Sequence, residues 1–311
     1  MNQTTIRTDR LVMSYVLTGK HGDKQEHDRV CNFINSDCKK KIIEGAKFWK
    51  TKKAPWSYGS VPIGYGNKLV IGFGYANKNM RASFQFNPSK ITPPEFCALH
   101  GHFEMLLHFG FHSLCAKGRV RDCEIAIDVD HAKFSDYWFV DTRMAASDCG
   151  YQPVGTLYLG ALQSRRQLRI YDKAKQMHEK LGIELPNERL RIEAQLRPVA
   201  HYAVAELPTI PNPFESLFVI SKSALSAKAN NELVAAFLAL ASTPGISSQK
   251  AYTASTDRKA LRQLLIACCP DWWKPSEIWS TYSESFDWVP PPHPAFANVA
   301  SEIKVGQACV A

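Results

Sequence analysis

The stretch RVRDCEIAIDVD, residues 119–130, decides the fold that we predict for this chain. Its side chains alternate between two kinds of surroundings, as they do along a β-strand. One face carries the apolar run Cys123, Ile125 and Ile127, so we expect the strand to lie inside a sheet. The opposite face gathers the carboxylates of Asp122, Glu124, Asp128 and Asp130.

Carboxylates that share one face of a strand repel one another, and burial makes their charges more costly. A bound divalent cation relieves this repulsion, and Mg²⁺ or Mn²⁺ prefers such oxygen ligands. We therefore predict a metal site on this face. A solvated face with arginines nearby is the alternative interpretation.

Two further strands are predicted, QLRIYDK at residues 167–173 and RLRIEAQLR at residues 189–197. On the first, Arg169, Tyr171 and Lys173 share one face. A phenol is a poor nucleophile unless cations stabilise its phenolate, and these two cations would also hold a phosphate. On the second, Glu193 shares a face with arginines, where it either completes a metal site or forms structural ion pairs.

The rest of the chain indicates an α+β protein with a central, mostly antiparallel sheet. Strands are predicted at residues 10–18, 57–76, 81–86 and 155–161, and a helix over residues 25–49. A capping box at Thr92 and Glu95 begins another helix. After a proline-rich connector at residues 208–214 the chain is mostly helical and ends in a loose tail. We expect domains at 1–207 and 208–311.

The charge is unevenly distributed along the chain. The 311 residues carry a formal net charge of +9, but residues 201–311 hold 8 basic and 9 acidic residues, so the excess lies in the first 200. Cations that follow a phosphate backbone, with aromatic rings that stack on bases, are typical of single-stranded DNA binding. A helix with a solvated lysine face is the alternative. The segment 39–58 supplies the candidates Lys39, Lys40, Lys41, Trp49, Lys52 and Lys53.

Composition narrows the class of protein. The longest apolar stretch, Leu233–Ala241, is much shorter than the ~20 residues that span a bilayer, and no secretory signal is visible. The number of cysteines, 9, is odd, and no Cys-x-x-Cys pair occurs. This pattern indicates reduced thiols rather than a disulfide framework. We expect a soluble cytoplasmic protein that does not bind membranes.

Three segments in order resemble the Rep trans family, the rolling-circle replication initiators of small plasmids and filamentous phages. They are CEIAIDVD at residues 123–130, GTLYLGALQSRRQLRIYDKAKQ at 155–176 and RLRIEAQLRP at 189–198. A weaker match is SFQFNPSKIT at 83–92. The family commonly has Gly-Ser-Arg or Gly-Ser-Lys where this chain has Gly160-Ala161-Leu162, and Arg165 and Arg166 would supply the missing charge.

The resemblance implies a relaxase-like nicking domain that acts on origin DNA, locally single-stranded. It implies that Tyr171 attacks the scissile phosphate and stays bound to the 5′ end, helped by Arg169 and Lys173. It also implies a divalent metal held by acidic residues. On this sequence those ligands are Asp128, Glu193, Glu124 and Asp130.

Two other functions fit the same residues. One is a non-catalytic DNA-binding regulator on the same sheet, and the other is a metal-dependent nuclease without a covalent step. Tyr158, on a neighbouring strand, is the reserve nucleophile. The helical region recognises the origin, forms a homodimer or binds a host helicase, and the sequence does not choose among these roles. If Tyr171 acts with the carboxylates, its side chain must converge with Asp128 and Glu193 on one face of the sheet.

Overall fold

The computed structural model is an α+β protein, as predicted, with a large antiparallel sheet and a partly helical C-terminal region. It describes residues 3–18, 22–51, 56–64, 66–76, 79–145, 149–152, 155–197, 202–286 and 289. Within these ranges, no helix is long and apolar enough to cross a membrane. The chain divides into two compact units. Unit 1 comprises Met1–Arg7, Glu124–Leu196 and Pro211–Ser283, and unit 2 comprises Thr8–Cys123, Arg197–Ile210 and Glu284–Ala311.

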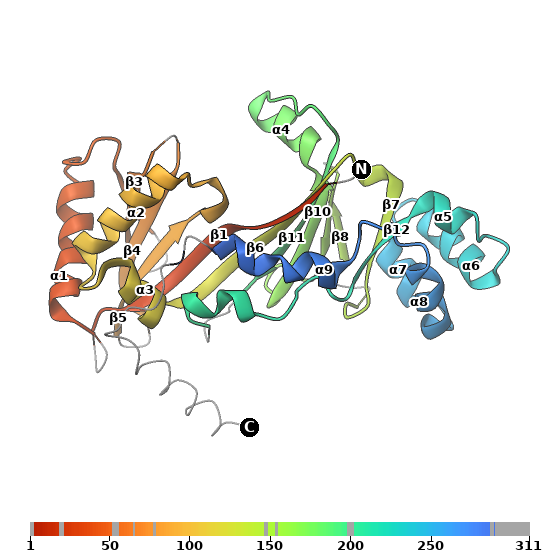
Figure 1. Cartoon of the computed structure of the whole chain (residues 1–311). Coiled ribbons are helices and arrows are strands. Elements are labelled where there is room, and N and C mark those ends of the chain that lie inside the picture. The colour runs from red at the N-terminus through yellow and green to blue at the C-terminus, as the bar shows by residue number, and fades with distance from the viewer. Residues whose placement is uncertain are drawn as a thin grey trace, which may run out of the picture. The chain divides into compact units, whose positions relative to one another are not determined.

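Unit 1 holds the strands that carry the predicted site. Their order is β1-β6-β11-β10-β9-β8, and β1 and β6 also supply residues to unit 2. The neighbours β11, β10, β9 and β8 are antiparallel. Helix α4, Lys173–Leu181, follows β10 directly and has no buried residue (Figure 1). The bounds are β1 Thr4–Val16, β6 Arg119–Asp130, β8 Cys149–Gln152, β9 Thr156–Leu159, β10 Arg166–Asp172 and β11 Arg189–Leu196.

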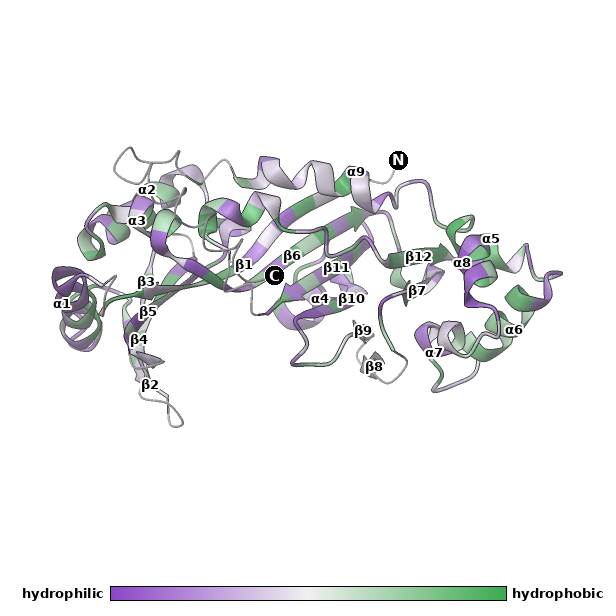
Figure 2. Cartoon of the chain, turned by 90° about the horizontal axis from the view of Figure 1, so that it is seen from below, coloured by the Kyte–Doolittle hydropathy of each residue, from purple (hydrophilic) through white to green (hydrophobic). Residues whose placement is uncertain are grey.

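A second, two-stranded sheet completes unit 1. Strand β7, Tyr137–Asp141, pairs antiparallel with β12, Leu217–Ser221, whose ribbon is hydrophobic over most of its length (Figure 2). Helices beside this sheet bury an apolar cluster that includes Val234, Phe237 and Leu265. Their bounds are α5 Lys222–Ser226, α6 Glu232–Ala241, α7 Ser248–Thr253 and α8 Arg258–Ile266. Helix α9, Pro275–Ser280, contributes no residue to this cluster.

Unit 2 is a sheet with helices on one face. Its strand order is β2-β3-β4-β5-β1-β6, and the neighbours from β2 to β1 are antiparallel. The ring of Phe84 in β5 lies 5.2 Å from that of Phe103 in α2, which shows that α2 covers the face of Phe84. The bounds are α1 Lys24–Asn32, β2 Lys47–Lys50, β3 Trp56–Pro62, β4 Lys68–Ala76, β5 Asn79–Phe86, α2 Pro93–Leu106 and α3 Gly110–Lys117.

The structure bears on three of the sequence predictions. The capping box at Thr92 and Glu95 is confirmed at the start of α2. The helix predicted over residues 25–49 is wrong at its end, because Lys47–Lys50 pairs with β3 instead. The predicted division at residue 207 differs from the observed grouping, because β12 pairs with β7 and draws residues 211–283 into unit 1.

Candidate active site

Tyr171 and Glu193 meet on one face of the β10–β11 ladder. The register places Tyr171 opposite Arg191 and Arg169 opposite Glu193, so these four side chains share one face. The Tyr171 hydroxyl donates a hydrogen bond to Glu193 Oε1 over 2.5 Å. Both side chains are buried, and the phenol is only 6% exposed. A carboxylate is therefore positioned to receive the phenolic proton.

Arg191 joins Glu193 to Asp128. Its Nε and Nη2 each lie 2.6 Å from one oxygen of Asp128, and its Nη1 lies 3.5 Å from Glu193 Oε1. A planar guanidinium matches a carboxylate in this two-point geometry. Arg7, from β1, also donates to Asp128 Oδ2. Asp128, Tyr171 and Glu193 thus belong to one connected network, as the expected convergence requires.

The remaining acids of the strand are paired as well. Arg169 bonds to Glu193 and lies 3.4 Å from Glu124, which also accepts from the Gln195 amide over 2.7 Å. Asp130 accepts from Arg189 Nε over 2.5 Å. Each of the four carboxylates proposed as metal ligands therefore lies against at least one guanidinium.

The arrangement of these groups bears on the predicted metal. Among the described residues, no group of three His, Cys, Asp or Glu side chains is placed to hold a metal ion. A divalent cation at Asp128 would compete with two guanidiniums for the same oxygens. As arranged, this donor set fits arginine rather than Mg²⁺ or Mn²⁺. The metal therefore stays a prediction.

The surroundings of Tyr171 keep its phenol protonated. Burial raises its pKa far above the ordinary value, and the negative charge of Glu193 and the hydrogen bond to it act in the same direction. Arg191 and Arg169 lower the pKa and oppose these effects in part. The isolated site therefore holds a neutral phenol hydrogen-bonded to a carboxylate, rather than a phenolate.

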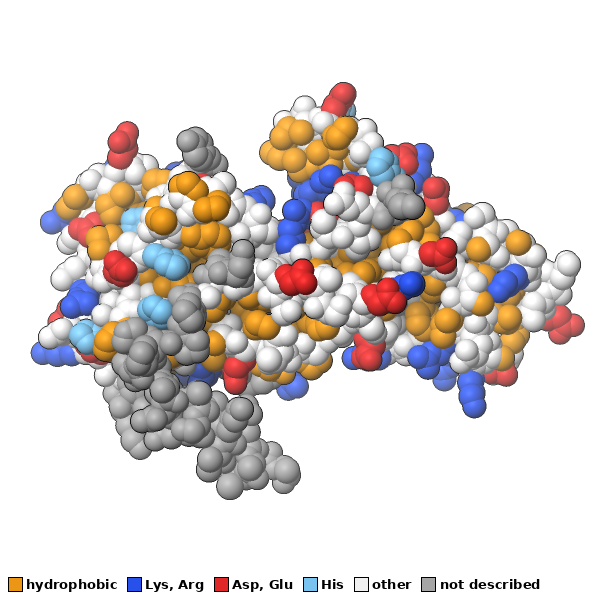
Figure 3. All heavy atoms as spheres, viewed as in Figure 1, with side chains coloured by type: hydrophobic (Ala, Val, Ile, Leu, Met, Phe, Trp, Pro, Cys, Tyr) orange, Lys and Arg blue, Asp and Glu red, His pale blue; other side chains and the backbone are white. Residues whose placement is uncertain are grey.

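A pocket of about 230 Å³ opens beside Tyr171. Its lining includes Arg169 and Tyr158, which face each other across β10 and β9. Lys175 and Lys180 of α4 also line it, and Figure 3 shows Lys and Arg side chains gathered beside that helix. Lys173 lies at the start of α4, with its Nζ 5.9 Å from the Tyr171 ring centroid. These cations suit a phosphate that enters next to the phenol.

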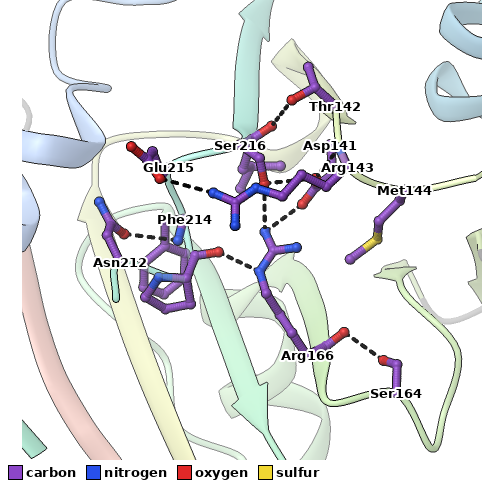
Figure 4. Close-up of polar contacts among 12 residues, drawn as sticks. Asp141, Thr142, Arg143, Met144, Ser164, Arg166, Asn212, Phe214, Glu215 and Ser216 are labelled. Carbon is purple, nitrogen blue, oxygen red and sulfur yellow. Dashed lines mark hydrogen bonds and ion pairs between the residues drawn. The ribbon is translucent and has the colours of Figure 1, made fainter. Parts of the chain in front are cut away.

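Arg165 and Arg166 differ in their surroundings. Arg165 is exposed in the turn before β10. Arg166 donates to Asp141 Oδ2 over 2.5 Å, to the Pro213 carbonyl over 2.5 Å and to the Ser216 hydroxyl over 3.2 Å (Figure 4). Asp141 is fully buried. The DNA contact of Arg166 stays a prediction, and in the structure its guanidinium links β10 to β7 and to the residues just before β12.

The other predicted DNA contacts lie in unit 2. Lys39, Lys40 and Lys41 are exposed, and Lys39 Nζ lies 5.9 Å from the Phe48 ring centroid. Trp49, 39% exposed, stands on β2 at the end of the strand order. Lys52 and Lys53 fall outside the described residues.

Sequence reasoning assigned no role to Arg7 or Gln195. Alternation did place Arg191 on the face of Glu193, but only the register shows that it lies opposite Tyr171. Arg7 carries no local signal, because its partner Asp128 lies 121 residues away in the chain. The partners of Arg7 and Arg191 can be identified only from the assembled strands.

Comparison of the chain with protein-family models gave no match. A search of curated proteins also gave no significant match. The case for a function therefore rests on the geometry of the site.

Proposed function

We propose that this protein initiates rolling-circle replication by cutting and rejoining one DNA strand through a phosphotyrosine bond on Tyr171. The observation that carries the proposal is the Tyr171–Glu193 hydrogen bond at the edge of a pocket lined by Arg169, Lys175 and Lys180. It joins a nucleophile, a proton acceptor and cations for a phosphate in one place. The α+β sheet supports the relaxase-like architecture that the sequence resemblance implies.

The proposed step transfers a phosphoryl group from DNA to the phenol. The Tyr171 oxygen attacks the phosphorus while its proton passes to Glu193. The bond from phosphorus to the 3′ oxygen breaks, and that oxygen takes a proton from water to leave a free 3′-OH. Arg169 and the lysines of α4 stabilise the charge that develops on the phosphate oxygens. The reverse reaction can reseal the strand, because the phosphotyrosine ester conserves the energy of the broken phosphodiester bond.

A second function is favoured by a different observation. Each acid of the network is already paired with an arginine, which is also how a purely structural polar cluster is satisfied. A DNA-binding regulator built on this sheet would need the basic surface and no chemistry at Tyr171. The two functions differ in one product, the covalent protein–DNA adduct.

The test compares two tyrosines that line the same pocket. Supercoiled plasmid carrying the DNA that flanks the gene is incubated with the wild-type protein, Tyr171→Phe or Tyr158→Phe. Denaturing gels then measure nicking and attached protein. We expect wild type and Tyr158→Phe to form a 5′-linked adduct and Tyr171→Phe to form none. An adduct with Tyr171→Phe would show that the nucleophile is misassigned, and no adduct with any protein would favour the regulator.

A further inference from the structure

Three aromatic rings form a ladder on one face of the unit 2 sheet. Trp49 of β2 lies opposite Tyr58 of β3, and their rings are parallel within 7° at a centroid distance of 5.5 Å. Trp56 lies on the same face as Tyr58, two residues earlier, with a centroid distance of 6.0 Å. Side chains from two strands therefore build one continuous aromatic surface.

The neighbouring strand β4 has glycines opposite two of these rings, which leaves room for them. Tyr58 faces Gly72 and Trp56 faces Gly74 in the β3–β4 register. A Cβ atom at Gly72 would lie 2.5 Å from Cε1 of Tyr58, so the tyrosine ring occupies the space that any other side chain would fill. The absence of a side chain at Gly72 therefore allows the Tyr58 ring to lie over β4.

The helices of unit 2 cover the other face. A Cβ atom at Gly59, which alternates with Tyr58, would lie 2.7 Å from Cys38 Sγ and 3.6 Å from Ile34. Those residues belong to the π-helical turn Phe33–Cys38 that follows α1. The aromatic ladder is therefore on the face that this turn does not cover.

The charged side chains of the strands that form and flank the ladder are all basic. Strands β2 to β5 contain no Asp or Glu. Lys47, Lys68 and Arg81 alternate onto the ladder's face, and the positive charge of Arg121 also acts on Tyr58. Such a surface is complementary to a polyanion, and added salt weakens the attraction between them.

We infer that the ladder of Trp49, Tyr58 and Trp56 is a binding platform for single-stranded DNA, with bases on the rings and phosphates on the flanking cations. Aromatic rings accept any unpaired base, whereas bases inside a duplex are already stacked. This inference goes beyond the proposed cleavage, because binding at the platform does not require Tyr171. In the proposed reaction the platform would hold the strand that nicking releases.

The test measures the binding of fluorescent twelve-nucleotide oligothymidylate to the full chain by anisotropy. All proteins carry Tyr171→Phe, so that cleavage and its failure do not enter the result. Stacking contributes ~1–3 kcal/mol per base, so we expect Trp49→Ala and Trp56→Ala each to weaken binding about fivefold or more. Gly72→Ala should also weaken binding, since it displaces Tyr58 without removing a ring.

Tyr75→Ala is the matched control. Tyr75 lies on β4, is 61% exposed and alternates onto the opposite face from Gly72 and Gly74. Its loss should leave the affinity unchanged, and circular dichroism should show that every variant is folded. Equal affinities for the control and the two tryptophan variants would overturn the inference, as would equal binding of the oligonucleotide and its duplex.

Discussion

Replacing Arg191 by methionine tests whether the polar network stabilises the sheet. The side chain of Arg191 is 6% exposed, and those of its partners Asp128 and Glu193 are 5% exposed. Removing one member of a buried ion pair costs ~3–5 kcal/mol, because the remaining charge is left without compensation. Arg7 and Arg169 stay beside the two acids. We therefore expect the lower end, a loss of about 3 kcal/mol in the free energy of unfolding.

Urea unfolding followed by circular dichroism measures that loss by linear extrapolation. The matched control is Arg143→Met, which breaks an ion pair with Glu215 in the same unit. Those side chains are 55% and 67% exposed, so the control should lose at most ~1 kcal/mol. If Arg191→Met costs no more than Arg143→Met, the network does not stabilise the fold in the way described.

Three further predictions concern pH, salt and α4. Burial and Glu193 raise the pKa of Tyr171, so the folded chain keeps this proton while the unfolded phenol ionises near ~10, and the stability of the protein should fall above about pH 10. Urea titrations at about pH 9 and 11 should show that this fall is smaller for Tyr171→Phe than for the wild type, by up to ~1.4 kcal/mol per pH unit. Equal falls for the two proteins would contradict the assignment. Changing residues 39–41 together to alanine should weaken oligonucleotide binding and flatten its salt dependence by ~0.7 per lost phosphate contact, and an unchanged slope would place the binding surface elsewhere. Asp172 caps α4 by accepting a hydrogen bond from the Lys175 amide over 2.9 Å, so Asp172→Ala should destabilise the helix by ~1 kcal/mol. Hydrogen exchange should then show faster exchange of the amides in α4 but not in β11, and unchanged exchange in α4 would refute the cap.

Alternation along the strands predicted the polar face of the sheet because side-chain direction has a period of two. It assigned Tyr171, Glu193 and Asp128 each to a polar face of its own strand, and the register and the contacts bring the three together. Register and strand order are set by long-range pairing, so the arginine partners of these acids could not be predicted. Lys47–Lys50 shows the same limit, since its pairing with β3 overrides a local pattern that favours a helix.

The pairing of acids with arginines also constrains how this protein can evolve. Asp128 is held by Arg7 from one strand and Arg191 from another, and these three positions are far apart in the sequence. Loss of Asp128 leaves the buried Arg191 without its main partner, and loss of either arginine leaves Asp128 with one guanidinium instead of two, so a second change is needed to restore the balance. Among relatives, positions 7, 128 and 191 should therefore covary as a group, and this covariation would identify β1, β6 and β11 as neighbouring strands.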